Sequence, residues 1–461
     1  MNKNTFFNIL LTIIVTALTS SCIMTTASTG LIYDVWDGSE TPIDSDFIID
    51  SAAKFAWLVK QTTTSGNTYT LVVNIDLENR DLAPVSGGFN GTFEGEGHTI
   101  KGLKLTNRQN TGLFSEIKGT SGNPAKVQNI KIVLADGTLT SSTVQSAGVL
   151  AGHAENAKIT SVTVSATNGA KLAIRSGCMD LYVGGIIGNS YSNVTISNSS
   201  SNVAIVTTSD DPSSQVHAGG ITGEINNSII KSCYAKGNVE ASGITTRAGG
   251  IAGNGHFGTT AEINLCYYTT GTVTAISNGT TGSYAAYAGG IIGQNYDVTT
   301  RCYSTGTVEA TSDYNNTFAG GISGELFDGT IELCYATGNI TAHSLPFMAR
   351  AGGILGHNNI GTSVMDCIFL RGNINASGAN PFAGNIAGDT NVAYTNNNTA
   401  ASVGINRNPT SGDTDVHNGN LDTYDNLLQK VTTSAFGSSA FGWSDFDWRF
   451  TTGQHPKLEW E

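Results

Sequence analysis

Six residues, Ala288-Gly-Gly-Ile-Ile-Gly293, decide the architecture of this chain, because close copies of them return along most of its length. The close copies are Val183–Gly188, Ala218–Gly223, Ala248–Gly253, Ala319–Gly324 and Ala351–Gly356, with looser versions at Ala147–Gly152 and Ala383–Gly388. The closing glycines of successive copies are 30 to 40 residues apart. Self-similarity at such a period is typical of solenoids, propellers and other repeat arrays.

Each repeat also has a fixed internal order. A cysteine follows the closing glycine by nine to thirteen residues, and four or five residues later comes a Gly-x-Val or Gly-x-Ile step. Each repeat therefore offers three short strand-like pieces separated by glycine turns. Stacked in parallel about 4.8 Å apart, such pieces form an all-β parallel β-helix, here of about eight or nine coils.

The predicted core consists of rows of like aliphatic residues, one from each coil. The first row is Leu150, Ile186, Ile221, Ile251, Ile291, Ile322, Ile354 and Ile386. The second row is Val239, Val273, Val308, Ile340 and Ile374. A β-propeller is the rival architecture. We favour the solenoid because no Trp-Asp or aromatic blade signature recurs.

Composition narrows the possible partners. Only 13% of residues are charged, 56 are glycine, and the formal net charge is −13. A nucleic-acid partner requires a basic face, so this charge argues against one, and also against electrostatic docking on anionic lipid. We expect no cofactor.

The N-terminus resembles a bacterial lipoprotein signal. Lys3 supplies the positive start, an apolar run covers Phe6–Leu18, and small residues precede Cys22. We expect residues 1–21 to be removed and Cys22 to carry the lipid, which would place the protein in the outer membrane with its surface exposed. The alternative is an ordinary secretory peptide with an incidental cysteine.

The segments beside the repeats are predicted to cap them, because open strand edges invite aggregation. Residues 22–110 form the expected N-terminal linker and cap, with helical periodicity over Ser51–Lys60. The repeats are expected over residues 111–419. Residues 420–461 form the expected C-terminal cap, with a short helix at Leu421–Val431 and three tryptophans that would plug the far end of the array.

The recurring Gly-Gly-Ile-x-Gly, followed by Cys-Tyr and Gly-x-Val, resembles the GLUG motif of bacterial cell-surface proteins. The flanking pieces Asn74–Leu77, Phe93–Ile100 and His455–Trp460 are similar to those that accompany this motif. The resemblance implies a surface-exposed β-helical protein of adhesin type. The same motif occurs in immunoglobulin A-specific metallopeptidases, so their zinc signature needs a direct test.

No catalytic motif is found. A peptidase of that kind needs His-Glu-x-x-His, yet none of the eight histidines precedes a glutamate and no two are four residues apart. The serine-hydrolase elbow and the phosphate loop are also missing from the sequence. A polysaccharide-degrading β-helix remains the enzymatic alternative. It would bring carboxylates together on one face, whereas Asp297, Asp328 and Asp366 occupy unrelated places in their repeats.

Five cysteines recur with the repeat, as Cys233, Cys266, Cys302, Cys334 and Cys367, and the first four are followed by tyrosine. Their spacing of 32 to 36 residues lacks the C-x-x-C pairing of a zinc site, and Ser161 and Ser197 fall near the same position in earlier coils. We therefore predict a structural row of free thiols and no metal. Strict strand alternation leaves open whether the cysteines or the tyrosines point inward. Cys178 lies outside the row.

The joins between coils vary and should emerge along one flank, where a ligand could bind. Aromatic side chains on that flank are candidate ligand-binding residues, namely Tyr284, Tyr287, Tyr314, Phe318 and Phe347. The other interpretation is that these rings cover the solenoid's own apolar wall. We expect a non-catalytic adhesin or ligand-binding scaffold, held to the membrane by its lipid, whose partner is a host or matrix glycan or protein. A purely structural envelope protein is the further alternative.

Overall fold

The computed structural model describes residues 46–61, 64–82, 88–256, 260–280, 284–359, 362–389, 393–395, 405–407, 448–449 and 456–461. They belong to one compact unit that spans Val35–Glu461. The predicted signal segment, the lipid-attachment residue Cys22 and the helix expected at Leu421–Val431 lie outside the described residues.

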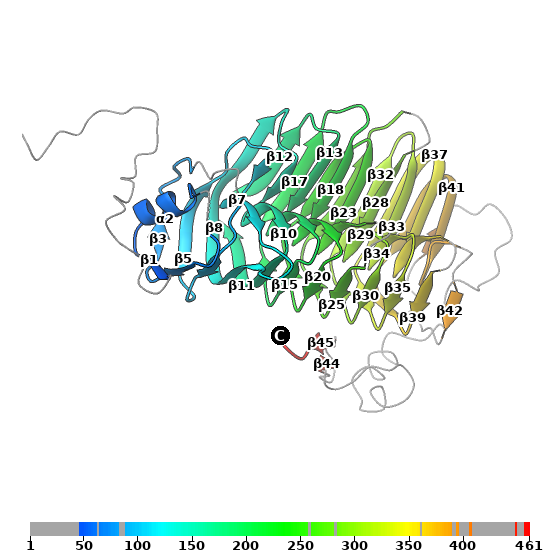
Figure 1. Ribbon diagram of the computed structural model, residues 1–461. Helices are drawn as coiled ribbons and strands as arrows, with labels where there is room; N and C mark the ends of the chain where they lie inside the picture. Colours follow the sequence, from blue (N-terminus) through cyan, green and yellow to red (C-terminus); the bar gives the residue numbers. More distant parts are fainter. Residues whose placement is uncertain are drawn as a thin grey trace, which may run out of the picture. The chain divides into compact units, whose positions relative to one another are not determined.

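The fold is a parallel β-solenoid of about nine turns, as the repeat predicted. Its strands follow one another along the stack in sequence order, from β1 to β41 (Figure 1). In the coil Ile187–Gly219 the chain forms five short strands, where the sequence pattern indicated three. One strand builds a wall that we call wall B, the next two build wall A, and the last two build wall C. The number differs because walls A and C each bend once within a coil.

Wall B comprises β7 (Phe114–Lys118), β10 (Ala151–Glu155), β14 (Ile187–Tyr191), β19 (Thr222–Asn226), β24 (Ala252–Gly255), β29 (Ile292–Asn295), β34 (Ser323–Leu326) and β38 (Leu355–Asn358).

Wall A begins with β1 (Asp46–Ile49), β2 (Thr68–Leu71), β4 (Thr92–Glu94), β8 (Ala125–Ser141), β11 (Ala157–Ala166), β15 (Thr195–Ser197), β20 (Ile229–Lys231), β25 (Glu262–Asn264), β30 (Val298–Thr300), β35 (Thr330–Glu332), β39 (Ser363–Met365) and β42 (Ala393–Thr395). Its second part comprises β3 (Ile75–Asp76), β5 (Thr99–Lys104), β16 (Ser200–Ser201), β21 (Tyr234–Ala235), β26 (Tyr267–Tyr268), β31 (Tyr303–Ser304), β36 (Tyr335–Thr337) and β40 (Ile368–Arg371).

Wall C begins with β12 (Lys171–Ser176), β17 (Ala204–Ser209), β22 (Val239–Gly243), β27 (Thr272–Ser277), β32 (Thr307–Ser312), β37 (Ile340–Gly352), β41 (Ile374–Gly384) and β43 (Ile405–Arg407). Its second part comprises β6 (Asn110–Thr111), β9 (Ser146–Gly148), β13 (Asp180–Gly184), β18 (Gln215–Gly219), β23 (Thr245–Gly249), β28 (Ala285–Gly289) and β33 (Asn316–Gly320), and is continued by the ends of β37 and β41.

Both predicted aliphatic rows form continuous stacks. In the first row, Ile221 N donates to Ile251 O and Ile251 N to Ile291 O, each at 2.9 Å, and the pattern continues to Ile386. In the second row, Val239, Val273 and Val308 are direct partners on β22, β27 and β32. All of these side chains are fully buried. Buried aliphatic surface in register therefore holds the coils together.

The cysteines point inward and the tyrosines outward. All five row cysteines are completely buried, and each thiol donates to the carbonyl two residues earlier, as Cys302 Sγ does to Thr300 O at 3.1 Å. The residue before each cysteine has a positive φ, for example 53° at Arg301 and 54° at Leu333. This left-handed residue bends the strand, so the alternation that made the sequence ambiguous does not hold there. The same position in earlier coils is taken by Ser199 and Val162, so Ser161 and Ser197 are one and two residues away from it.

The parallel stack begins earlier than the expected boundary at residue 111. β1 pairs with β2, β2 with β4 and β4 with β8, all in parallel. Stacking needs only apolar side chains at the same inward place, as at Tyr69 and Phe93, and does not need the glycine corner. Within this segment the helix α2 (Ala52–Leu58) is capped by Ser51, which accepts from Lys54 N, and packs Phe55 against Phe93 and Phe114.

The C-terminal residues lie against the side of the stack, which corrects the expectation that they plug its far end. β44 (Trp448–Arg449) and β45 (Lys457–Leu458) form an antiparallel pair. Trp448 packs on Tyr303 and Tyr335, and Trp460 on Tyr234 and Tyr267. The outward tyrosine row offers a broad aromatic surface, and burial of that surface draws the tryptophans to it.

Candidate functional site

Wall C turns into wall B at the repeated Gly-Gly step, and this corner cannot hold a side chain. A Cβ on Gly219 would lie 1.9 Å from Thr222 O, and one on Gly220 would lie 2.1 Å from Gly250 O in the next coil. Neither glycine has a positive φ. Glycine is therefore required because other backbone atoms approach closely, and not because of an unusual φ angle. The tight corner brings the outer side chains of the two walls face to face.

Two ladders of outer side chains meet along this corner, and we call them together the corner network. The wall C ladder is Tyr182, His217, Arg247, Tyr287, Phe318, Arg350 and Phe382. The wall B ladder is His153, Asn189, Glu224, Asn254, Gln294, Glu325 and His357. Within the described part of the chain, this line brings half-buried and buried polar groups together.

His217 links a cation to a carboxylate in the middle of the network. Arg247 Nη1 lies 3.0 Å from His217 Nε2, and His217 Nδ1 lies 3.1 Å from Glu224 Oε2. Because a guanidinium can only donate, Nε2 accepts and the imidazole proton sits on Nδ1, on the side of the ring that faces Glu224. Burial lowers the pKa of His217, which keeps the ring in this neutral form.

Glu224 is ionised in this setting. Burial opposes its ionisation, but hydrogen bonds from His217, His256 and Asn254 outweigh burial and hold its pKa well below the ordinary value. Asn254 Nδ2 donates to Glu224 Oε2 at 3.1 Å. The half-exposed His256 lies 3.6 Å away through its Nδ1, and its pKa is raised by Glu224. Arg247 and Glu224 are therefore opposite charges bridged by a neutral imidazole.

A second group surrounds Glu325, three coils after Glu224 on the wall B ladder. Glu325 is bonded by Gln294 Nε2, and His357 Nε2 lies 3.9 Å from Glu325 Oε1 while its Nδ1 contacts Asp389. Arg350 lies 3.4 Å from Asp389 and closes the group. Burial raises the pKa of Glu325, which favours its protonated form. Glu325, His357 and Asp389 therefore lie in line along the stack.

The structure brings together two of the five predicted aromatic residues. Tyr287 and Phe318 are direct ladder partners with ring centroids 5.4 Å apart, and Arg247 lies 5.6 Å from the Tyr287 ring. Phe318 is only 3% exposed and stacks on His357, so it belongs to the wall itself.

Of the other three predicted aromatic residues, Tyr284 and Tyr314 lie on the inserts between the two parts of wall C, and Phe347 lies within β37, where the register with β41 shifts. Tyr314 is 53% exposed, whereas Tyr284 and Phe347 are half-buried. Neighbouring inserts bond one another, as Asn315 Nδ2 does to Gly279 O at 2.7 Å. Among the described residues, no ring contact joins these three to each other or to the Tyr287–Phe318 pair. The inserts do emerge on one flank, but the rings on them do not form one cleft.

A further cavity lies at another corner, where wall B turns into wall A. It is a groove of about 530 Å³, which we call the asparagine groove, and it crosses successive coils. Its lining residues are Thr120, Ser121, Pro124, Asn156, Lys158, Asn193, Val194, Thr195, Asn227, Ser228, Ile229 and Thr260. Amide and hydroxyl groups predominate in this lining, and it holds no carboxylate.

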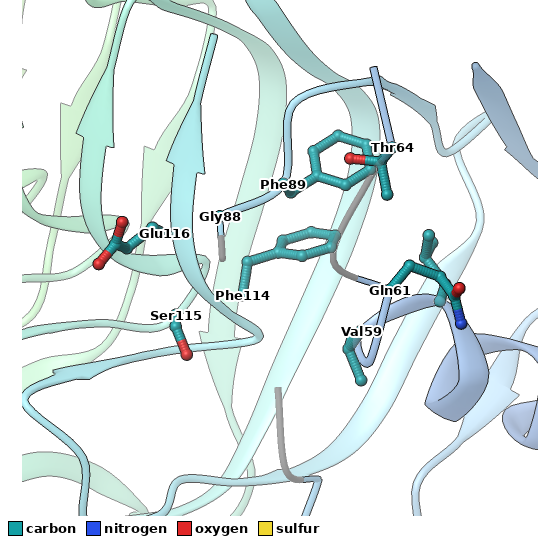
Figure 2. A pocket seen from close by; sticks show the side chains of 9 residues that line it. Val59, Gln61, Thr64, Gly88, Phe89, Phe114, Ser115 and Glu116 are labelled. Carbon is teal, nitrogen blue, oxygen red and sulfur yellow. The ribbon is translucent and has the colours of Figure 1, made fainter. Parts of the chain in front are cut away.

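A much smaller cavity of about 10 Å³ lies beneath α2, between Val59, Thr64 and the rings of Phe89 and Phe114 (Figure 2). The two rings are 4.9 Å apart. This volume is that of a single water molecule, so the cavity is a packing defect near the first coil and not a substrate site.

The described residues contain no group of three or more His, Cys, Asp or Glu side chains that could hold a metal ion. The row cysteines are all free thiols inside the solenoid, and burial raises the pKa of Cys233, Cys302 and Cys367. Cys178 is half-buried and donates to Ser142 O at 3.4 Å. In the described part of the chain, no helix has the length and apolar character needed to cross a membrane.

Sequence reasoning missed the corner network, although a signal for it exists. The wall C ladder residue stands directly before each Ala-Gly-Gly, as His217 and Arg247 do, and the wall B residue directly follows the closing glycine, as Glu224 does. The asparagine groove also has a signal, an asparagine that follows wall B, but the partner residues differ from coil to coil.

No family model matches the chain. A stretch of 148 residues, 29% of the chain, is 32% identical to halomucin from Haloquadratum walsbyi, and the match spans 2% of the length of halomucin. Among solved structures, a candidate immunoglobulin A1 protease from Bacteroides ovatus aligns over 90% of this chain and 93% of its own, at 16% identity and a TM-score of 0.34.

Proposed function

We propose that this protein is a lipid-anchored scaffold of the bacterial surface, which resembles GLUG-motif proteins and presents the walls of a β-solenoid to a ligand outside the cell. The observation that carries the proposal is the uninterrupted parallel stack. Its main-chain hydrogen bonds run from coil to coil, so the outer side chains are held in fixed ladders. Such a body presents a regular surface at little entropic cost on binding.

Other features support this role. The chain starts with a lipoprotein-like segment that ends at Cys22, and its charge disfavours nucleic acid and anionic lipid. The local similarity to halomucin is consistent with a cell-surface setting. In this role the protein acts as an adhesin or ligand-binding module, and no covalent bond is broken.

The anchor and the location are tested together in the producing cell. Metabolic labelling with a palmitate analogue should mark the wild-type chain and not the Cys22→Ser variant, and protease added to intact cells should remove the wild-type chain. A chain that is unlabelled and protected from the protease contradicts the proposal. A chain that is labelled but protected would place the anchor in the inner leaflet and remove the adhesin role.

One observation favours a polysaccharide-degrading enzyme as the second candidate. Glu325, His357 and Asp389 form a row in which burial raises the pKa of one carboxyl while the other contacts the imidazole. A protonated acid near an ionised carboxylate is the arrangement used in glycoside hydrolysis. Release of new reducing ends from a polysaccharide panel, lost in Glu325→Gln, would support the enzyme. If no polysaccharide in the panel releases new reducing ends, the enzymatic function is ruled out.

A further inference from the structure

We infer that the asparagine groove binds an extended, hydroxyl-rich glycan chain that lies along the stack and crosses several coils. The inference rests on the proposed ligand-binding role but not on the membrane anchor. It places the ligand at a different corner from the aromatic inserts that the sequence suggested.

The backbone fixes the position of each amide in the groove. Asn156, Asn193 and Asn227 occupy the same corner of successive coils, with φ values of 47°, 59° and 44°. Their main chains are bonded to the next coil, since Asn156 N donates to Ser192 O and Asn193 N to Asn227 O, both at 2.8 Å. Asparagine tolerates this left-handed conformation better than most residues, and the corner therefore repeats it.

The amides form a line that is only partly satisfied within the protein. Asn193 Nδ2 donates to Asn156 Oδ1 at 3.1 Å, and Thr260 Oγ1 donates to Asn227 Oδ1 at 3.0 Å. Each amide has two donor hydrogens and an acceptor oxygen, so donors and acceptors remain on Asn193 and Asn227 for a ligand. Their spacing follows the coil repeat of about 4.8 Å.

The other residues that line the groove also suit a hydroxyl-rich glycan. Thr195 and Thr260 add hydroxyls, and the exposed side chain of Ile229 offers an apolar surface to the C–H face of a sugar ring. Lys158 is the single charged residue in the lining. A chain that carries both donors and acceptors on every unit fits such a wall, and ligand sites commonly combine a few placed polar groups with apolar contacts.

Two other ligand classes fit less well. An extended peptide binds solenoids and sheets by adding a strand to a free edge, but the groove lies on the side of the stack, where the main-chain groups already bond neighbouring coils. A nucleic acid would need a basic lining, whereas the groove has one lysine and the whole chain carries a net charge of −13.

The test uses two variants that remove amides without straining the backbone. Glycine adopts positive φ freely, so Asn193→Gly and Asn227→Gly keep the corner and delete only the side chains. The matched control is Asn198→Gly, which lies in the same coil as Asn193, has a φ of 50° and does not line the groove. All three substitutions are made in the full chain carrying Cys22→Ser, so that lipid plays no part.

Binding is measured by calorimetry with hexasaccharides of β-linked glucose, β-linked xylose, α-linked mannose and galacturonic acid. We expect at least one of them to bind. The dissociation constant should rise about fivefold for each amide removed, because one neutral hydrogen bond is lost each time, and should be unchanged in Asn198→Gly. Failure of the whole panel to bind, or equal loss in Asn198→Gly, overturns the inference. Neither result bears on palmitate labelling or protease sensitivity, so the proposed anchor and location stand or fall separately.

Discussion

A single methyl group is enough to disturb the corner where wall C turns into wall B. A Cβ on Gly289 would lie 1.8 Å from Ile292 O, and both atoms belong to main chain that the neighbouring coils hold in place. Gly177 is a natural comparison, since the nearest atoms to its Cβ position are 3.6 Å away. The two glycines differ in how closely other atoms approach them, whereas neither has a positive φ.

We therefore predict that Gly289→Ala lowers the free energy of unfolding by about 3 kcal/mol, the upper part of the range for overpacking. Gly177→Ala should change it by less than about 0.5 kcal/mol. Urea denaturation followed by circular dichroism measures both. Equal effects of the two substitutions would show that the corner can relax, and would contradict the close-approach argument.

The burial of the row cysteines leads to a second prediction, about the reactivity of the thiols. In Cys22→Ser, six thiols remain, of which Cys178 is half-buried and the other five are completely buried. Ellman's reagent should therefore label one thiol promptly and five more only after denaturation. In the double variant with Cys178→Ser the prompt reaction should disappear. Prompt labelling of two or more thiols would mean that the row is open to solvent.

Asp297 is expected to make the stability of the folded protein depend on pH. Its Oδ2 is buried without a hydrogen-bond partner among the described residues. Burial raises its pKa to about 6, Asp328 adds to the rise and His256 reduces it. The folded state thus holds a proton that the unfolded state has lost, so stability falls as pH rises from about 4 to 6 and then levels off.

We predict that Asp297→Asn raises the melting temperature at pH 7 by about 1–2 °C and leaves it unchanged at pH 4. The gain is small because the carboxyl is partly solvated. Thermal unfolding across this pH range tests the point. A gain of the same size at both pH values would assign the effect to packing and not to ionisation.

The tyrosine row and the C-terminal strands are coupled at the scale of elements. Tyr234, Tyr267, Tyr303 and Tyr335 stack with centroids 4.8 to 5.0 Å apart, and their outer face is covered by Trp448, Leu458 and Trp460. Tyr303 Oη donates to Glu461 and Tyr335 Oη to Pro456 O. Burial raises the pKa of both phenols, which keeps them neutral donors. Trp460 Nε1 donates to Leu265 O at 3.1 Å, so aromatic packing and hydrogen bonds from three side chains hold this end of the chain.

Trp448→Ala should release the C-terminal strands, because a tryptophan that is 1% exposed is lost from the contact. Limited proteolysis should then remove the C-terminal end at least tenfold faster than in the wild type, while Trp448→Phe restores most of the protection. Unchanged proteolysis in Trp448→Ala would show that the hydrogen bonds and the packing of Trp460 suffice.

At the scale of the whole molecule, each coil contacts mainly its two neighbours. Stability is then approximately a sum over coils and their interfaces. Deletion of residues 294–324, one coil from one closing glycine to the next, should therefore leave a folded protein with an unchanged circular dichroism signal per residue. Deletion of residues 294–308 should unfold it, because it removes β30 and β31 and places wall C residues where wall A residues belong. Equal tolerance of both deletions would contradict the stacked-coil account.

The sequence by itself determined the parallel β-solenoid, its period and both aliphatic rows. These follow from spacing, because Ile221 and Ile251 can bury their side chains only by stacking on the same residue of the next coil. Local patterns of this kind need no knowledge of distant contacts.

Only the tertiary structure decided the direction of the cysteines, the start of the stack, the place of Trp448 and the sites. A left-handed residue before each cysteine inverts the alternation, and the tryptophans lie on a tyrosine row more than a hundred residues away in sequence. The corner network arises because residues before and after a glycine step face each other across a bend, and the asparagine groove because one corner repeats over several coils. Each depends on how the chain bends in space, and a bend of one residue changes which face a side chain occupies.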